Sequence, residues 1–127
     1  MGDEVALYRL IPTAQCDVVD GEWAFQSAAF DNTSGTDEMS IVLGDTLQLL
    51  ERVPDDLPER IFGGDPDRWG VAVLSASAVR AEDQDIRRSP VAEEPAHGDV
   101  VGPKGSKRRR RLKKSAEWVV PPTLRPD

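Results

Sequence analysis

The chain has 127 residues and a formal net charge of −7, with 39% hydrophobic and 31% charged side chains. No apolar run approaches the ~20 residues of a membrane-spanning helix, and the single cysteine, Cys16, excludes an internal disulfide framework and a cysteine-rich zinc site. The opening residues lack the basic start and apolar core of an export signal, so we expect one cytoplasmic domain without membrane contact.

The first part of the chain predicts two strand regions separated by turn signals. Residues 5–11 are rich in β-forming side chains and stop at Pro12, which predicts a strand. Asp20-Gly21 is a strong turn pair and predicts a tight bend. In residues 23–30 we expect an extended stretch that carries aromatic side chains on one face and ends at a polar loop.

The middle of the chain predicts a strand, a short helix and a loop. Residues 39–43 are β-rich, and residues 45–53 predict a short helix with Asp45 at its N-cap and leucines at helical spacing. Residues 54–67 are dominated by residues that break regular structure, so we expect a loop there.

The last third predicts two strands and one long helix. Residues 69–77 form the most apolar run and predict a central strand, and residues 97–102 predict the last strand of the body. We expect a helix over residues 106–118 and a frayed tail over residues 121–127.

These elements predict an α+β fold in a single small domain over residues 1–120. We expect a mostly antiparallel sheet, one short helix and a basic C-terminal helix laid across the sheet. The expected core consists of Leu7, Phe25, Phe30, Ile41, Leu43, Leu47, Leu50, Val71, Val73, Val100 and Leu112.

Charge is divided unevenly along the chain. Residues 1–103 carry 21 acidic and 7 basic side chains, whereas residues 104–127 carry 9 basic and 2 acidic ones. The eleven positions from Lys104 to Lys114 hold eight basic residues and no acidic residue. Such asymmetry is a hint of an anionic partner.

On a helical wheel, Leu112, Ala116 and Val119 form a narrow apolar stripe that would dock on the sheet. A second face aligns Lys107, Arg111 and Lys114 with Trp118. Basic side chains beside an aromatic ring suit a nucleic-acid backbone and a stacked base. We therefore expect Lys104, Lys107, Arg108, Arg111, Lys114 and Trp118 to contact nucleic acid.

The start of this helix is unusual, because Ser106 would cap a first turn that holds only cations. Cations at a helix N-terminus oppose the macrodipole, so an anion is expected nearby. It would be phosphate, or the protein's own carboxylates at Glu93, Glu94 and Asp99. The run KRRRRLKK also fits a nuclear address in a eukaryotic host.

Gly102, Pro103, Lys104 and Gly105, followed by the basic helix, resemble the GxxG loop of KH domains. That loop clamps the backbone of four nucleotides. The resemblance implies that these four residues contact a nucleic-acid backbone.

His97, the one histidine, lies beside Asp99 and would serve as a general acid or base or as a single metal ligand; the simpler interpretation is a strand-edge histidine. LYRLI followed by FQSAAF also resembles the Tyr-Arg strand and the later serine strand of ADP-ribosyltransferase-like domains. That resemblance implies that Arg9 and Ser27 hold NAD, with His97 as a third site residue.

The stretches DGEWAFQSAAF, EPAHGDVVG and RLKKSAEWV resemble a group of small bacterial cytosolic proteins without a known activity. We interpret the chain as a non-enzymatic binding module, free-standing or part of a larger assembly, with no cofactor and no metal. Its basic helix would contact nucleic acid or an acidic protein surface. The alternative is a small ADP-ribosyltransferase-like enzyme that uses NAD.

Overall fold

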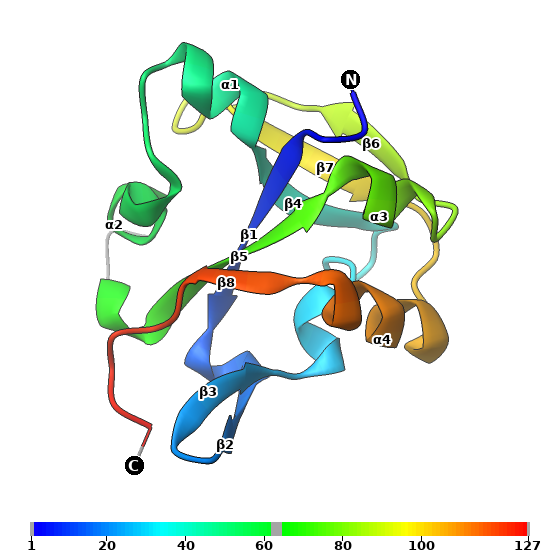
Figure 1. Cartoon of the computed structure of the whole chain (residues 1–127). Coiled ribbons are helices and arrows are strands. Elements are labelled where there is room, and N and C mark those ends of the chain that lie inside the picture. The colour runs from blue at the N-terminus through cyan, green and yellow to red at the C-terminus, as the bar shows by residue number, and fades with distance from the viewer. Residues whose placement is uncertain (1, 62–64, 127) are drawn as a thin grey trace.

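The computed structural model describes residues 2–61 and 65–126, and its main feature is a six-stranded sheet (Figure 1). The strand order is β6-β7-β4-β1-β5-β8, and every neighbouring pair is antiparallel. A hairpin of β2 and β3 projects below the sheet. The prediction of a small, mostly antiparallel α+β domain is confirmed.

The strands are β1 Ala6–Pro12, β2 Cys16–Val19, β3 Glu22–Phe25, β4 Glu38–Leu43, β5 Trp69–Ser75, β6 Asp85–Arg88, β7 His97–Val101 and β8 Glu117–Val120. The helices are α1 Gly44–Leu49, α2 Leu57–Ile61, α3 Ala76–Arg80 and α4 Ser106–Ser115. Four 3-10 turns, η1 Thr13–Gln15, η2 Ser27–Phe30, η3 Pro54–Asp56 and η4 Pro66–Arg68, complete the fold. No helix within this described chain is long and apolar enough to cross a bilayer.

Side-chain alternation along the strands gives the sheet two apolar faces. On one face, Leu7, Ile41 and Leu74 are buried under α4, η2 and α3. On the other face, Val42 and Val71 pack with side chains from α1 and α2. Nine members of the expected core are buried: Leu7, Phe25, Phe30, Ile41, Leu43, Leu47, Val71, Val100 and Leu112.

The predicted bend at Asp20-Gly21 is confirmed. Both residues have positive φ, 52° and 77°, which is the backbone of the tight turns that follow the twist of a hairpin. The extended stretch expected over residues 23–30 is wrong in its second half, because β3 ends at Phe25 and the chain turns into η2. That turn buries Ala29 and Phe30 against the core.

The short helix expected over residues 45–53 is shorter than predicted. It ends at Leu49, and Glu51 adopts a left-handed conformation with φ of 54°. Leu50 is consequently 42% exposed and does not join the core, and Val73 is only partly buried. Residues 54–67 contain η3, α2 and the start of η4, although residues 62–64 lie outside the described chain.

The C-terminal part differs most from the prediction. The helix expected over residues 106–118 ends at Ser115, Ala116 is extended, and the chain enters β8 beside β5. Thus residues 97–102 are not the last strand, and β5 is interior but not central. The expected tail is hydrogen-bonded: Leu124 N donates to Asp67 O, and Trp23 Nε1 donates to Leu124 O.

Candidate nucleic-acid interface

The basic helix α4 lies on one side of the molecule, against η2 and close to α3 (Figure 1). Leu112 is its single buried side chain and belongs to the core under the sheet. With 100° between successive residues, Arg108 and Arg109 flank Leu112 on either side, and Lys107, Arg110 and Lys114 face away from it. One leucine therefore fixes which cations face the body.

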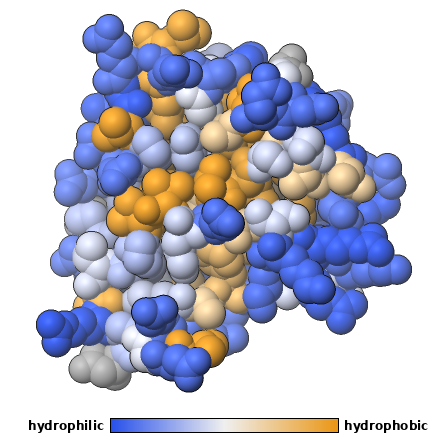
Figure 2. All heavy atoms as spheres, viewed as in Figure 1, coloured by the Kyte–Doolittle hydropathy of each residue, from blue (hydrophilic) through white to orange (hydrophobic). Residues whose placement is uncertain are grey.

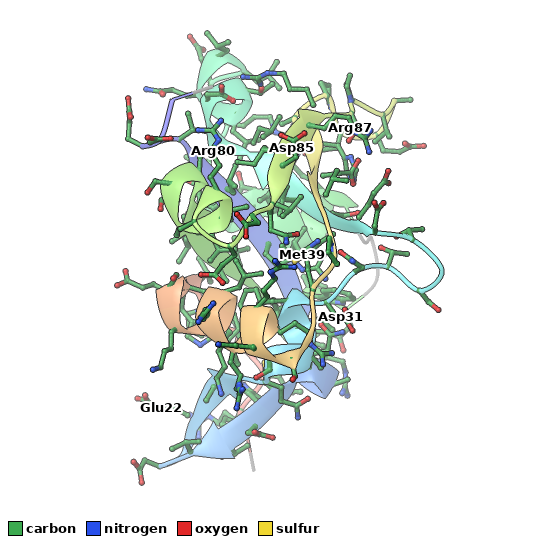
Figure 3. The ribbon with its side chains drawn as sticks, turned by 90° about the vertical axis from the view of Figure 1, so that its right-hand side faces the viewer. Glu22, Asp31, Met39, Arg80, Asp85 and Arg87 are labelled. Carbon is green, nitrogen blue, oxygen red and sulfur yellow. The ribbon has the colours of Figure 1, made fainter. Side chains whose placement is uncertain are left out.

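Three arginines of α4 are paired with carboxylates of the body. Arg109 Nη1 lies 3.0 Å from Asp31 Oδ2, Arg108 Nη2 lies 3.5 Å from Asp83 Oδ2, and Arg111 Nη1 lies 3.4 Å from Glu82 Oε1. Figure 3 shows Asp31 beside the segment that leads into α4. We call Arg108, Arg109 and Arg111 the docking arginines.

These acidic partners differ from those expected. Glu94 pairs instead with Arg52, at 2.6 Å, and Asp99 accepts a hydrogen bond from Ser89. The sequence neighbours of α4 point away from it because β7 carries the chain across the sheet before the helix begins. Carboxylates at the end of η2 and after α3 take their place.

The remaining cations of α4 form an exposed face. Lys107, Arg110, Lys113 and Lys114 are all exposed, and none has a carboxylate within 4.0 Å among the described residues. In Figure 2, hydrophilic side chains gather over this part of the molecule. We call these four residues the free face.

Arg108 and Arg111, which we expected to contact nucleic acid, form ion pairs with the body, whereas Arg110 and Lys113, which were not in the expected set, are exposed. A signal for them was present in the sequence. Since Leu112 was expected in the core, the positions opposite it on the wheel were already defined. The expected face was instead drawn through Trp118, which the structure places on β8 and not on the helix.

Lys104 does not belong to the exposed face, because it is buried, with 6% of its surface exposed. Its ammonium group donates to Asn32 Oδ1, to Val100 O at 3.0 Å and to Gly102 O at 3.0 Å. Burial lowers the pKa of Lys104 to about 8, although the carboxylates of Asp37 and Asp31 oppose this shift. Its role is to hold the turn before α4.

Trp118 is also placed differently from the prediction. It lies on β8, where its indole Nε1 donates to Trp23 O at 3.1 Å and its ring packs against Phe25 at 4.3 Å between centroids. Partly buried and hydrogen-bonded, the ring anchors β8 and the hairpin, and it lies outside the helix that carries Lys107 and Lys114.

The turn from residue 102 to residue 105 joins the strand β7 to α4, whereas a KH loop joins two helices. Gly105, and not Ser106, is the N-cap, and no side chain caps the helix. Gly102 has φ of 146°, and a Cβ there would lie 2.8 Å from the side chain of Gln84. The turn thus has a conformation that glycine permits.

The three residues expected to hold NAD do not share one site. Arg9 and His97 line one cavity of about 250 Å³ in the sheet. Ser27 begins η2 and is not among the residues that line it. The described chain contains no group of three or more histidine, cysteine or acidic side chains arranged to hold a metal ion.

The arrangement of α4 can hold a row of anionic groups through long-range charge and exposed donors. Its free face spans two turns of helix, about 10 Å from Lys107 to Lys114. No model of a known protein family, no curated protein and no solved structure matches the chain.

Proposed function

We propose that this protein is a non-enzymatic binding module that contacts nucleic acid through the free face of α4. The observation that carries the proposal is the set of four exposed cations that have no carboxylate partner among the described residues, in a chain whose sequence has 23 acidic residues. The chain is rich in carboxylates, yet the described ones that pair with α4 do so with the docking arginines and not with the free face. Unpaired cations at this spacing suit the phosphates of a nucleic-acid backbone.

The rest of the molecule favours local, backbone-directed contact. Without the basic segment the chain is strongly acidic, so a polyanion would be repelled everywhere except at α4. Trp118 lies on β8, where it packs against Phe25 and donates to Trp23 O, so it does not belong to the free face and offers that face no ring for base stacking. We therefore expect binding that depends on phosphates and has little sequence preference.

The test is binding of fluorescent single-stranded DNA, double-stranded DNA and RNA at several salt concentrations. Wild type is compared with a Lys107→Gln, Arg110→Gln, Lys114→Gln variant. A matched control, Arg60→Gln, Arg68→Gln, Arg125→Gln, removes the same charge from exposed arginines outside α4. We expect the wild type and the control to bind and the free-face variant to lose binding by at least about tenfold.

Salt dependence gives a second readout. Three or four phosphate contacts predict a log–log slope of about −2 to −3 on single strands, and the free-face variant should show a slope near zero. Equal loss in the matched control would contradict a local site and indicate an effect of net charge. If no nucleic acid binds at low salt, the proposal is wrong, and an acidic protein surface becomes the partner to test.

A further inference from the structure

A second candidate site is separate from α4: the groove beside the hairpin that residues 121–126 occupy. After β8 the chain runs down next to β3, and Trp23 of that strand contacts it (Figure 1). These six residues, which we call the C-terminal segment, have the sequence PPTLRP and form no helix or strand. Three of them are prolines, whose rings hold φ at about −65° and leave no main-chain N–H group to donate.

The indole of Trp23 binds the main chain of the C-terminal segment. Its Nε1 donates to Leu124 O at 2.7 Å, a contact between residues 101 positions apart in the chain. Proline-rich segments dock in grooves lined by aromatic side chains, because their preformed backbone loses little conformational entropy on binding. An indole supplies both the ring and a donor for a free carbonyl group. Trp23 therefore holds the segment by chemistry that suits a proline-rich ligand.

The sheet also has a position for a proline ring. Pro122 is buried, and it lies with Trp118 over Gly70 of β5. A Cβ on Gly70 would lie 2.5 Å from Cζ3 of Trp118 and 2.7 Å from Cδ of Pro122. Because a side chain at position 70 would displace both rings, this glycine creates the space in which the proline packs.

Asp67 anchors the C-terminal segment from outside the hairpin. Thr123 Oγ1 donates to Asp67 Oδ1 at 2.6 Å, and Leu124 N donates to Asp67 O at 2.9 Å. Asp67 belongs to η4, whereas Trp23 belongs to β3. The contacts that retain the segment can therefore be removed without changing the aromatic wall of the groove.

The C-terminal segment leaves part of the groove open. A cavity of about 290 Å³ remains beside it, and the body contributes Gly21, Glu22, Trp23 and Trp118 to the lining. Glu22 is exposed and brings a carboxylate, and none of these four residues is basic. The segment itself carries Arg125. The charge of the groove therefore favours a ligand that combines proline rings with a basic residue.

We propose that this groove binds a proline-rich segment of a partner protein that also carries a basic residue. The C-terminal segment occupies the groove as an intramolecular competitor, and its high effective concentration excludes the partner until its own contacts are lost. A carbonyl group of the partner accepts the hydrogen bond of Trp23, and a proline takes the place of Pro122 over Gly70. This site is independent of the proposed binding of nucleic acid by α4.

The experiment measures binding of the fluorescently labelled peptide PPTLRP to the full chain by fluorescence anisotropy. In a Thr123→Val, Leu124→Pro variant, which we call the release variant, both hydrogen bonds to Asp67 are lost and the groove is unchanged. We expect the release variant to bind the peptide at least about tenfold more tightly than the wild type, because its competitor is weaker. The matched control Thr36→Val removes a surface hydroxyl group that donates to Thr33 O, and it should bind like the wild type.

Two altered peptides and one further variant assign the contacts. The peptide AATLRA lacks the proline rings, PPTLEP reverses the charge, and each should bind the release variant at least about tenfold more weakly than PPTLRP. Adding Trp23→Phe to the release variant keeps a ring but removes the indole N–H group, so it should weaken PPTLRP by about tenfold. Circular dichroism checks the fold, and if the Trp23→Phe protein does not fold, the comparison of the three peptides still decides.

The proposal is overturned if PPTLRP does not bind the release variant saturably, if AATLRA binds it as tightly, or if the release variant binds no more tightly than the wild type. Sedimentation velocity tests a second copy of the chain as the occupant. We expect a monomeric release variant, and self-association that the peptide dissolves would overturn the proposal in favour of a second copy. The Lys107→Gln, Arg110→Gln, Lys114→Gln variant should bind PPTLRP like the wild type, so a failure of either proposal can be recognised separately.

Discussion

At the scale of single residues, Lys104 links charge to the geometry of the turn before α4. Its buried ammonium group ties Asn32 to the carbonyl groups of Val100 and Gly102. These hydrogen bonds fix the conformation of the turn and so fix where α4 begins. They also bury a cation that has no close carboxylate among the described residues. The lowered pKa of Lys104 reports the cost of this burial.

The stability of the protein should depend on pH through Lys104. The native group loses its proton near pH 8, whereas in the unfolded chain it keeps the proton until about pH 10.5, so the cost of the buried charge disappears as pH rises between these values. From pH 7 to pH 10, the free energy of unfolding of the wild type should rise by about 2 kcal/mol relative to Lys104→Met. Urea unfolding of both proteins at each pH measures this difference, and parallel changes would contradict it.

At the scale of elements, α4 is an unusual helix because its N-terminus is uncapped and cationic. Gly105 offers no side-chain acceptor, and the first turn holds no acidic residue. The docking arginines compensate in part, since Arg108 and Arg109 bring the carboxylates of Asp83 and Asp31 close to that end. The packing of Leu112 in the core supplies the remaining stabilisation. Tertiary contacts therefore stabilise a helix that has no side-chain cap at its N-terminus.

Adding a cap should stabilise this helix. Gly105 has the extended conformation of an N-cap, with φ of −63° and ψ of 171°, and a Cβ there would meet nothing within 4 Å. Gly105→Ser should therefore be about 0.5 to 1 kcal/mol more stable than the matched Gly105→Ala, which gains the same Cβ but no acceptor. Chemical unfolding of the pair measures this, and equal stabilities would show that the introduced hydroxyl group does not cap α4.

At the scale of the whole molecule, one core joins the sheet, α4 and the hairpin. Trp23 and Trp118 hold the hairpin, β8 and the C-terminal segment together through hydrogen bonds to main-chain carbonyl groups. Cys16, at the start of β2, is buried in this core. Its exposure therefore requires the hairpin to detach from the core.

The thiol of Cys16 should report that opening. Burial raises its pKa to about 11, with a smaller contribution from Asp17, so little thiolate exists at pH 8. Reaction with a disulfide reagent at pH 8 should be roughly 100-fold slower in the native protein than in the unfolded chain. Stopped-flow absorbance in buffer and in guanidinium chloride compares the rates. A native rate near the unfolded one would mean that the hairpin is detached.

Much of the fold could be predicted because its signals are local. Strand β1, the hairpin turn at Asp20-Gly21 and strand β7 follow from β-rich stretches and turn residues. The C-terminal strand β8 could not be predicted in this way. The side-chain pattern of residues 116–120 continues that of the helix before them. These residues nevertheless form a strand, because the edge of β5 offers main-chain hydrogen-bonding partners.

The basic helix expected from the sequence is present, and its binding of nucleic acid stays a prediction. The density of cations from Lys104 to Lys114 is a property of the sequence, and no fold would remove it. The positions of Asp31, Glu82 and Asp83, which lie outside α4, decide which of these cations form ion pairs. Likewise, the burial of Lys104 depended on Asn32, 72 residues away in the chain.

The sequence by itself determined the fold class, the hairpin and the existence of one basic helix, because short-range backbone preferences and composition decide these features. Only the tertiary structure decided that Arg110 and Lys113 have no carboxylate partner among the described residues, that Trp118 packs against the hairpin, and that Arg9 and His97 are among the residues that line one cavity. Each of these facts depends on contacts between residues far apart in the chain, and burial and ion pairing are properties of those contacts.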